Sequence, residues 1–290
     1  MQDYRKYCGA LRVAAVCFGM IIPAAANGVF AAASLKLQQI DKQKLTQLQL
    51  EIEKQRLRLS SLEVEDRREA LTRLGSMHHP DASRAALSAL HDPAPIVRAT
   101  AAASILSLPA EESAASLLPL LGDKEEFVRQ QVAYALGQTR SRTAVAGLIE
   151  RLADKKDSVR GSAAVALGEI ADAAAVTSLA AILKPQSGVI PGKKKKKANR
   201  EQNDFVLRAA AHSLGQIGDR AALPALIVML EDEKAGDDVR REAAFALGAI
   251  GDSSALPVLR GVLMARDPYL SQAAREAILK ISRFQNPRGI

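Results

Sequence analysis

The chain of 290 residues has few side chains that could carry out catalysis or bind a metal ion. Its four histidines are His78, His79, His91 and His212, and its two cysteines are Cys8 and Cys17. The pair His78-His79 supplies fewer ligands than the three or four of a zinc site. No spacing of serine or cysteine to histidine indicates a nucleophile with its base, and no glycine-rich phosphate loop is present. We therefore expect a protein without catalytic residues, metal or cofactor.

A set of oppositely charged residues recurs along the chain, with an aspartate six residues before an arginine, or eight in the last case. These pairs are Asp92 and Arg98, Asp123 and Arg129, Asp154 and Arg160, and Asp232 and Arg240. In two further units both members are missing together, with Pro185 and Leu207 in one and Ala265 and Ser271 in the other. This joint loss indicates that the two groups interact. We assign the eight residues to the architecture, each pair contributing on the order of 1 kcal/mol or less.

A run of five lysines lies inside an insertion that spans residues 184–203 and is rich in proline and glycine. The run consists of Lys193, Lys194, Lys195, Lys196 and Lys197. This composition predicts a solvated loop. Two interpretations stay open: a tolerated surface insertion, or a contact with an anionic surface such as lipid headgroups. No aromatic residue is interleaved with the lysines, so base stacking is not supported.

The composition predicts that helices must position all of these residues. Hydrophobic residues make up 48% of the chain, whereas aromatic residues make up 3% and tryptophan is absent. Such a core of alanine and aliphatic residues is typical of closely packed helices and argues against an all-β fold. The net charge of +8 is concentrated in residues 1–80 and in the insertion. The remainder is close to neutral, which makes a nucleic-acid partner an unfavoured alternative.

Self-comparison reveals a repeat. Its apolar anchor positions are Val97, Val128, Val159, Val206, Val239 and Leu270, separated by 31, 31, 47, 33 and 31 residues. A period near 31 with two helical patterns per unit predicts an all-α solenoid of stacked antiparallel helix pairs. Within a unit, we expect Gly168, Gly215 and Gly248 to mark the end of the second helix. The aspartates that follow them, such as Asp172, are expected to cap the next helix.

Two copies of one motif, Ser213–Pro224 and Ala246–Pro257, together with the Asp-x-x-x-x-Val-Arg turn, resemble the HEAT-repeat family. The resemblance is to its short bacterial variety, which is also seen in bilin-lyase-like proteins, and it covers residues 76–290. It implies a superhelix in which each arginine reaches an aspartate in its own or an adjacent turn, forming a ladder. It also implies a scaffold that binds another protein. A bilin-lyase-like chaperone or enzyme and a nucleic-acid-binding HEAT-like protein are the alternatives.

The N-terminal residues 1–33 are typical of an export signal or a membrane anchor. Arg5 and Lys6 precede the apolar run Val13–Ile22, and the small residues through Ala26 suit a signal peptidase. An uncleaved anchor that spans a bilayer once is the alternative. Either interpretation predicts a protein of the cell envelope, periplasmic or membrane-anchored.

Residues 34–75 are predicted to form one long helix, because proline is absent from this stretch and glycine first occurs at Gly75. Leu45, Leu48, Ile52 and Leu59 lie on one stripe of this helix with a coiled-coil spacing. The stripe predicts either a stalk that forms a homodimer through residues 37–71 or a helix that folds back as a cap on the repeats.

Overall fold

A computed structural model describes residues 46–184 and 203–285, in which helices account for all regular secondary structure. The chain divides into two compact units, residues 1–51 and 52–290, and the fold below is that of the second. The predicted signal or anchor at 1–33 and the lysine run at 193–197 lie outside the described residues. Within the described ranges, no helix is long and apolar enough to cross a membrane.

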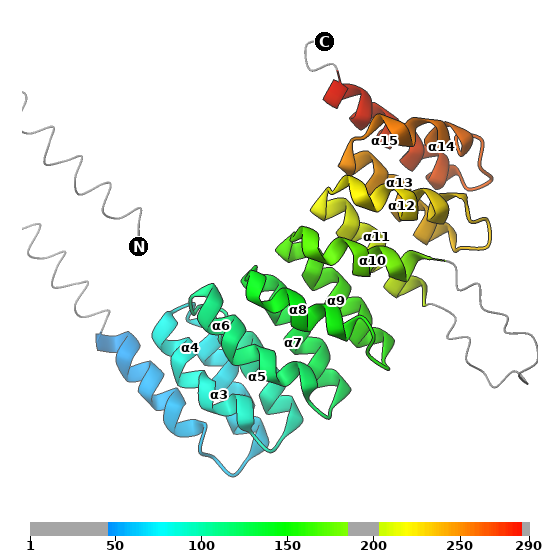
Figure 1. The fold of residues 1–290 in the computed structure, drawn as a ribbon. Coiled ribbons are helices and arrows are strands. Elements are labelled where there is room, and N and C mark those ends of the chain that lie inside the picture. The colour runs from blue at the N-terminus through cyan, green and yellow to red at the C-terminus, as the bar shows by residue number, and fades with distance from the viewer. Residues whose placement is uncertain (1–45, 185–202, 286–290) are drawn as a thin grey trace, which may run out of the picture. The chain divides into compact units, whose positions relative to one another are not determined.

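The second unit consists of helix pairs that follow one another in chain order (Figure 1). The shorter helices, here called the short-helix layer, are α4 (Pro80–Ala86), α6 (Ala110–Leu117), α8 (Val145–Arg151), α10 (Val176–Leu183), α12 (Leu223–Glu231) and α14 (Leu256–Gly261). The longer ones, the long-helix layer, are α3 (Val64–Ser76), α5 (Pro95–Ser104), α7 (Glu126–Thr139), α9 (Asp157–Ile170), α11 (Asp204–Ile217), α13 (Asp237–Ile250) and α15 (Pro268–Gln285). Each long helix packs against the next one, from α3 to α15. The all-α solenoid predicted from the period is confirmed.

Aliphatic residues at equivalent positions of the long helices form the core of this array. Val97, Val128, Val159, Val206 and Val239 are all buried near the start of their helices. Many other buried residues of these helices are alanines, such as Ala133, Ala164, Ala210 and Ala244, and their small side chains allow close approach of neighbouring helices. Because each repeat buries its apolar face against its neighbours, the stability of the array comes mainly from these interfaces.

The glycines of the Leu-Gly motif serve close packing and do not end the helices, contrary to the prediction. Gly168, Gly215 and Gly248 lie inside α9, α11 and α13, which end at left-handed residues three positions later. A Cβ atom at Gly248 would lie 2.7 Å from the Cα atom of Ala277 on the next long helix. The expected caps are confirmed, because Asp172 Oδ1 accepts a hydrogen bond from the Ala174 N–H at 2.9 Å, with the same arrangement at the other two turns.

The single helix predicted over residues 34–75 is wrong in its described part. One helix covers 46–58, residues 59–63 form a turn, and α3 begins at Val64. The turn contains no glycine or proline. It is held by the buried side chain of Arg67, whose Nη1 donates to the carbonyl oxygens of Ser61 and Leu62 at 2.9 and 3.2 Å. Since α3 packs against α5, it belongs to the first repeat, and dimerisation through 37–71 remains an untested prediction.

Candidate functional site

Three buried ion pairs connect consecutive turns of the array. Arg67 pairs with Asp92, Arg98 with Asp123, and Arg129 with Asp154. In each pair Nε donates to Oδ2 at 2.7 to 2.8 Å and Nη2 donates to Oδ1 at 2.9 to 3.0 Å. Each of these arginines therefore reaches the aspartate 25 residues later, in the next repeat, and Arg98 and Arg129 do not pair with the aspartate six residues before them. We call these three pairs the ladder.

The aspartate six residues before the arginine contributes its backbone. Arg98 Nη1 donates to the carbonyl oxygens of Asp92 and Pro93 at 2.9 and 3.2 Å. The carboxylate of Asp123 also accepts a hydrogen bond from the N–H of Glu125 at 2.9 Å. Burial alone would raise the pKa of Asp123, but the hydrogen bonds from Arg98 and this N–H outweigh it, so the pKa lies below its ordinary value. The same balance lowers the pKa of Asp92 and Asp154.

The ladder stops at the insertion. Arg160 donates to the carbonyl oxygen of Asp154 at 3.0 Å and pairs with Asp157 of its own helix. Asp232 and Arg240, which the spacing also assigned to the ladder, lie outside it. Arg240 Nε donates to the carbonyl oxygen of Leu230 at 3.0 Å, and Asp232 accepts the N–H of Lys234. The reason lies in the sequence, because the positions 25 residues away hold Leu207 and Ala265.

Arg67 is a member of the ladder that the six-residue spacing missed. No aspartate lies six residues before it, since that position holds Ser61. The three pairs of the ladder share a spacing of 25 residues from the arginine to its aspartate.

Exposed aromatic side chains lie along the long-helix layer. They are Phe127, Tyr134, Phe205, Phe245 and Tyr269, with exposed fractions between 37% and 66%. They occupy the second or the ninth position of α7, α11, α13 and α15. Positions seven residues apart lie on the same side of a helix, so the rings share the face of the layer that points away from the core. None of these five rings fills the core.

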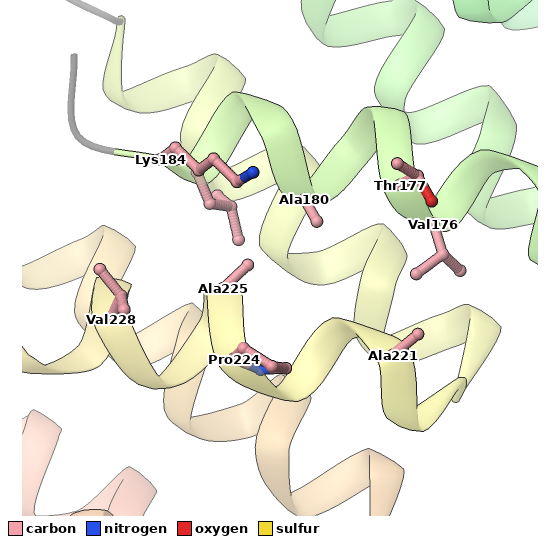
Figure 2. A pocket seen from close by; sticks show the side chains of 9 residues that line it. Val176, Thr177, Ala180, Lys184, Ala221, Pro224, Ala225 and Val228 are labelled. Carbon is pink, nitrogen blue, oxygen red and sulfur yellow. The ribbon is translucent and has the colours of Figure 1, made fainter. Parts of the chain in front are cut away.

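A shallow apolar groove of about 350 Å³ lies between α10 and α12 in the short-helix layer (Figure 2). Ala180 of α10 lies toward Ala225 of α12, and Val176 lies at the end of the groove nearer Ala221, just before α12. Thr177 and Lys184 supply the polar atoms of its lining. A hydroxyl and one ammonium group offer no acid–base pair, so the groove has the chemistry of an apolar contact site.

A profile of HEAT repeats matches residues 54–136, 115–190 and 196–279, which together make up most of the chain. The chain belongs to the HEAT-repeat family. No curated protein matches it significantly.

The chain is similar to several solved structures at low identity and with TM-scores below 0.5. The complex of CpcE and CpcF of phycocyanin lyase from Nostoc sp. PCC7120 is 22% identical, with 80% of this chain and 93% of that chain covered and a TM-score of 0.47. A designed armadillo repeat protein in complex with the peptide (KR)4 is 18% identical, with 79% and 98% covered and a TM-score of 0.43. Human deoxyhypusine hydroxylase is 19% identical, with 81% and 96% covered and a TM-score of 0.38.

His79 and His212 of this HEAT-repeat protein lie on separate elements. His79 precedes α4 and accepts the N–H of Asp81 at Nδ1, at 3.2 Å. His212 Nδ1 lies 2.7 Å from Glu242 on the neighbouring long helix. Across the described ranges, no group of three potential metal ligands comes together.

Proposed function

We propose that this HEAT-repeat protein is a non-catalytic scaffold that holds a partner protein on its long-helix layer. The observation that carries the proposal is the gathering of Phe127, Tyr134, Phe205, Phe245 and Tyr269 on one face. Aromatic side chains bring large contact areas at low conformational cost, and they are enriched at the centres of protein interfaces. The core itself is built of alanine and aliphatic residues, and of these rings Phe205 also packs on Gly161 of α9.

The charges of the same layer support a protein rather than a nucleic acid as the partner. A surface that follows a phosphate backbone needs rows of accessible lysine or arginine. The arginines that recur along the first repeats, Arg67, Arg98 and Arg129, are buried and paired with aspartates. The aspartates therefore balance the charge of these arginines inside the array, and the arginines do not offer it to a phosphate backbone.

We further propose that the protein acts in the cell envelope. Support comes from the sequence of residues 1–33, where basic residues precede the apolar run Val13–Ile22. N-terminal sequencing of the protein from its source cells tests this proposal. A new N-terminus after Ala26, or an intact chain in the membrane fraction, is expected. An intact Met1 on a soluble cytosolic protein would contradict it.

Site-specific photo-crosslinking of the full chain in its source cells tests the scaffold proposal. A benzophenone amino acid replaces Tyr134 or Phe245 of the long-helix layer, and Glu150 of α8 in a control variant. We expect light-dependent adducts with another protein from Tyr134, Phe245 or both, and none from Glu150, which is exposed in the short-helix layer. Adducts from Glu150 alone, or from none of the three, would refute the proposal.

A further inference from the structure

The exposed side of α5, α7 and α9 carries no accessible charge between the helix ends. Residues 95–104, 127–139 and 158–168 contain one charged residue each, in a chain that is 25% charged. The three are Arg98, Arg129 and Arg160, which are 4% to 8% exposed. Their guanidinium groups are bound to aspartates and to backbone carbonyl oxygens of the turns. What remains toward solvent on these stretches is uncharged.

Charged residues border this region on both sides. On α3, the exposed side chains include Glu65, Asp66 and Arg68. On the other side, α11 packs against α9 and carries Arg208, whose side chain is half exposed and pairs with Asp238 of α13. On α7 and α9 themselves, acidic residues are found toward the helix ends, at Glu126, at Asp157 and at Glu169, which holds on α9 the position that Gln138 holds on α7. The loss of charge is thus local to three adjacent helices.

We call the solvent-facing side chains of these three stretches the uncharged face. Ile96 lies on α5, Phe127, Gln131 and Tyr134 on α7, and Ser162 and Val165 on α9. Since α5 packs against α7 and α7 against α9, these side chains form one continuous surface. Tyr134 and Val165 occupy the same position in consecutive repeats, 31 residues apart. Depletion of charge, exposed aromatic rings and a charged rim are together the composition of a protein interface core.

We propose that the uncharged face binds a polypeptide segment of the partner protein that itself lacks charged side chains. The inference rests on the proposed scaffold function and names its contact surface and the chemistry of its ligand. Apolar side chains of the segment pack on Phe127, Tyr134 and Val165, and the amide groups of Gln131 and Gln138 hydrogen-bond polar groups of the segment.

Electrostatic complementarity selects this class of ligand. A charged side chain that docks on the uncharged face loses its water and finds no opposite charge, which is costly. An uncharged segment avoids that cost, because serine and glutamine side chains replace the hydrogen bonds its polar groups made to water. Nucleic acid and anionic lipid lack the cations that they need on this face.

Selection from a displayed library of random peptides on the immobilised full chain tests the ligand class. We expect the selected peptides to be depleted in aspartate, glutamate, lysine and arginine relative to the starting library, and enriched in apolar residues. Enrichment of basic or acidic peptides, or of no peptide, would overturn the inference.

Variants of the full chain then locate the binding of the selected peptides. Tyr134→Arg, at an exposed position, is expected to weaken binding at least tenfold, whereas Tyr134→Phe keeps it. Gln138→Glu places one charge on α7 without a change in size and is expected to weaken binding about threefold. Gln272→Glu is the control, because it makes the same change at an exposed position of α15, outside the uncharged face. Equal effects of the two glutamates, or none from Tyr134→Arg, would overturn the inference.

The cellular crosslinks separate failure of this inference from failure of the scaffold function. Adducts from Phe245 of α13 without adducts from Tyr134 would keep the scaffold and refute the uncharged face as its contact surface. An adduct of Tyr134 with a second copy of this chain would also refute the inference. Absence of adducts from both positions would refute the scaffold function itself.

Discussion

Each arginine of the ladder donates hydrogen bonds to acceptors in two consecutive turns. Arg98 uses Nε and Nη2 for the carboxylate of Asp123 and Nη1 for the carbonyl oxygens of its own turn. A guanidinium group presents its donors in a fixed planar fork, so one side chain can fix the distance between two consecutive turns. A lysine has no such fork, so it would bind only one of the two turns.

Replacement of Asp123 by asparagine measures how much one ion pair of the ladder, here called a rung, contributes to the free energy of unfolding. The introduced amide oxygen can still accept the N–H of Glu125, but Arg98 loses its counter-ion in a site where both side chains are about 10% exposed. We expect the free energy of unfolding to fall by about 2 kcal/mol, between the values for exposed and fully buried pairs. Urea denaturation followed by circular dichroism gives the value.

Asp232→Asn is the matched control for this change. Asp232 caps its turn through the N–H of Lys234 at 3.0 Å, as Asp123 does with Glu125, but Leu207 stands where its arginine would be. We expect its unfolding free energy to stay within about 0.5 kcal/mol of the parent. Equal losses in both variants would mean that capping, and not the ion pair, stabilises these turns.

The lowered pKa values of the ladder aspartates predict how stability depends on pH. Asp92, Asp123 and Asp154 have a lower pKa in the folded protein than in the unfolded chain, where it is about 3.9. Their contribution is therefore fully present above about pH 4 and is lost as the pH falls through the folded pKa. Denaturation measured from about pH 6 to about pH 2.5 is expected to show this loss. In Asp123→Asn the loss should be smaller, and an identical profile would contradict the assignment.

The sequence contains the members of the ladder but not their pairing. A spacing of six residues places an aspartate and an arginine in one turn, and their joint absence shows coupling without showing which copies meet. The pairing depends on how one repeat stacks on the next, which brings Arg98 to Asp123 and leaves Asp92 to Arg67. Asp232 and Arg240 follow the local pattern and still miss the ladder, because the repeats on either side lack their partners.

At the scale of the element, the Leu-Gly motif sets the distance between long helices. Gly215 and Gly248 lie against Ala246 and Ala277 of the next helix, where a Cβ atom would approach the backbone within 2.8 Å. The helices are fixed at these points by backbone contact, so a methyl group cannot be accommodated by a change of side-chain rotamer.

Gly248→Ala tests this contact. Alanine stabilises an open helical position by up to about 1 kcal/mol, but here overpacking against Ala277 costs about 1 to 3 kcal/mol. We expect a net loss of about 1 to 2 kcal/mol in thermal and urea unfolding. Gly261→Ala is the control, since Gly261 ends α14 with nothing within 4 Å of its added Cβ, and a neutral or stabilising effect is expected. A stabilised Gly248→Ala would refute the close-packing role.

The periodic residues predict the helices well, and the exceptions have a local cause. The recurring valines and Leu-Gly pairs place the long helices because packing of one repeat on the next is the same each time. The turn at residues 59–63 escaped prediction because a buried side chain, Arg67, creates it without glycine or proline. The exposed aromatics recur at equivalent helix positions, as Phe127 and Phe205 do, but helical spacing alone does not tell an outward apolar residue from a core one.

At the scale of the whole repeat array, the ladder predicts uneven stability. The turn before α5 and the arginine of α5 each belong to a rung, whereas Asp232 and Arg240 beside α13 belong to none. Amides of α5 are therefore expected to exchange with solvent at least tenfold more slowly than those of α13, measured by hydrogen exchange and mass spectrometry. Both helices lie one long helix from an end of the layer, so fraying affects them equally. Equal or reversed protection would contradict the prediction.

The substitution Ala265→Asp is expected to introduce a further ion pair of the ladder, with Arg240, in the second half of the array. Ala265 lies 25 residues after Arg240, and its N–H bonds the carbonyl oxygen of Val262 at 3.1 Å, as the N–H of Asp123 bonds that of Leu120. An aspartate in this turn would meet Arg240, and we expect the unfolding free energy to rise by about 1 kcal/mol together with slower exchange in α13. The gain should vanish when Arg240→Gln is added, and Ala265→Asn should not reproduce it. A gain that survives Arg240→Gln would show that the new side chain stabilises its own turn and that stacking does not bring position 265 to the arginine.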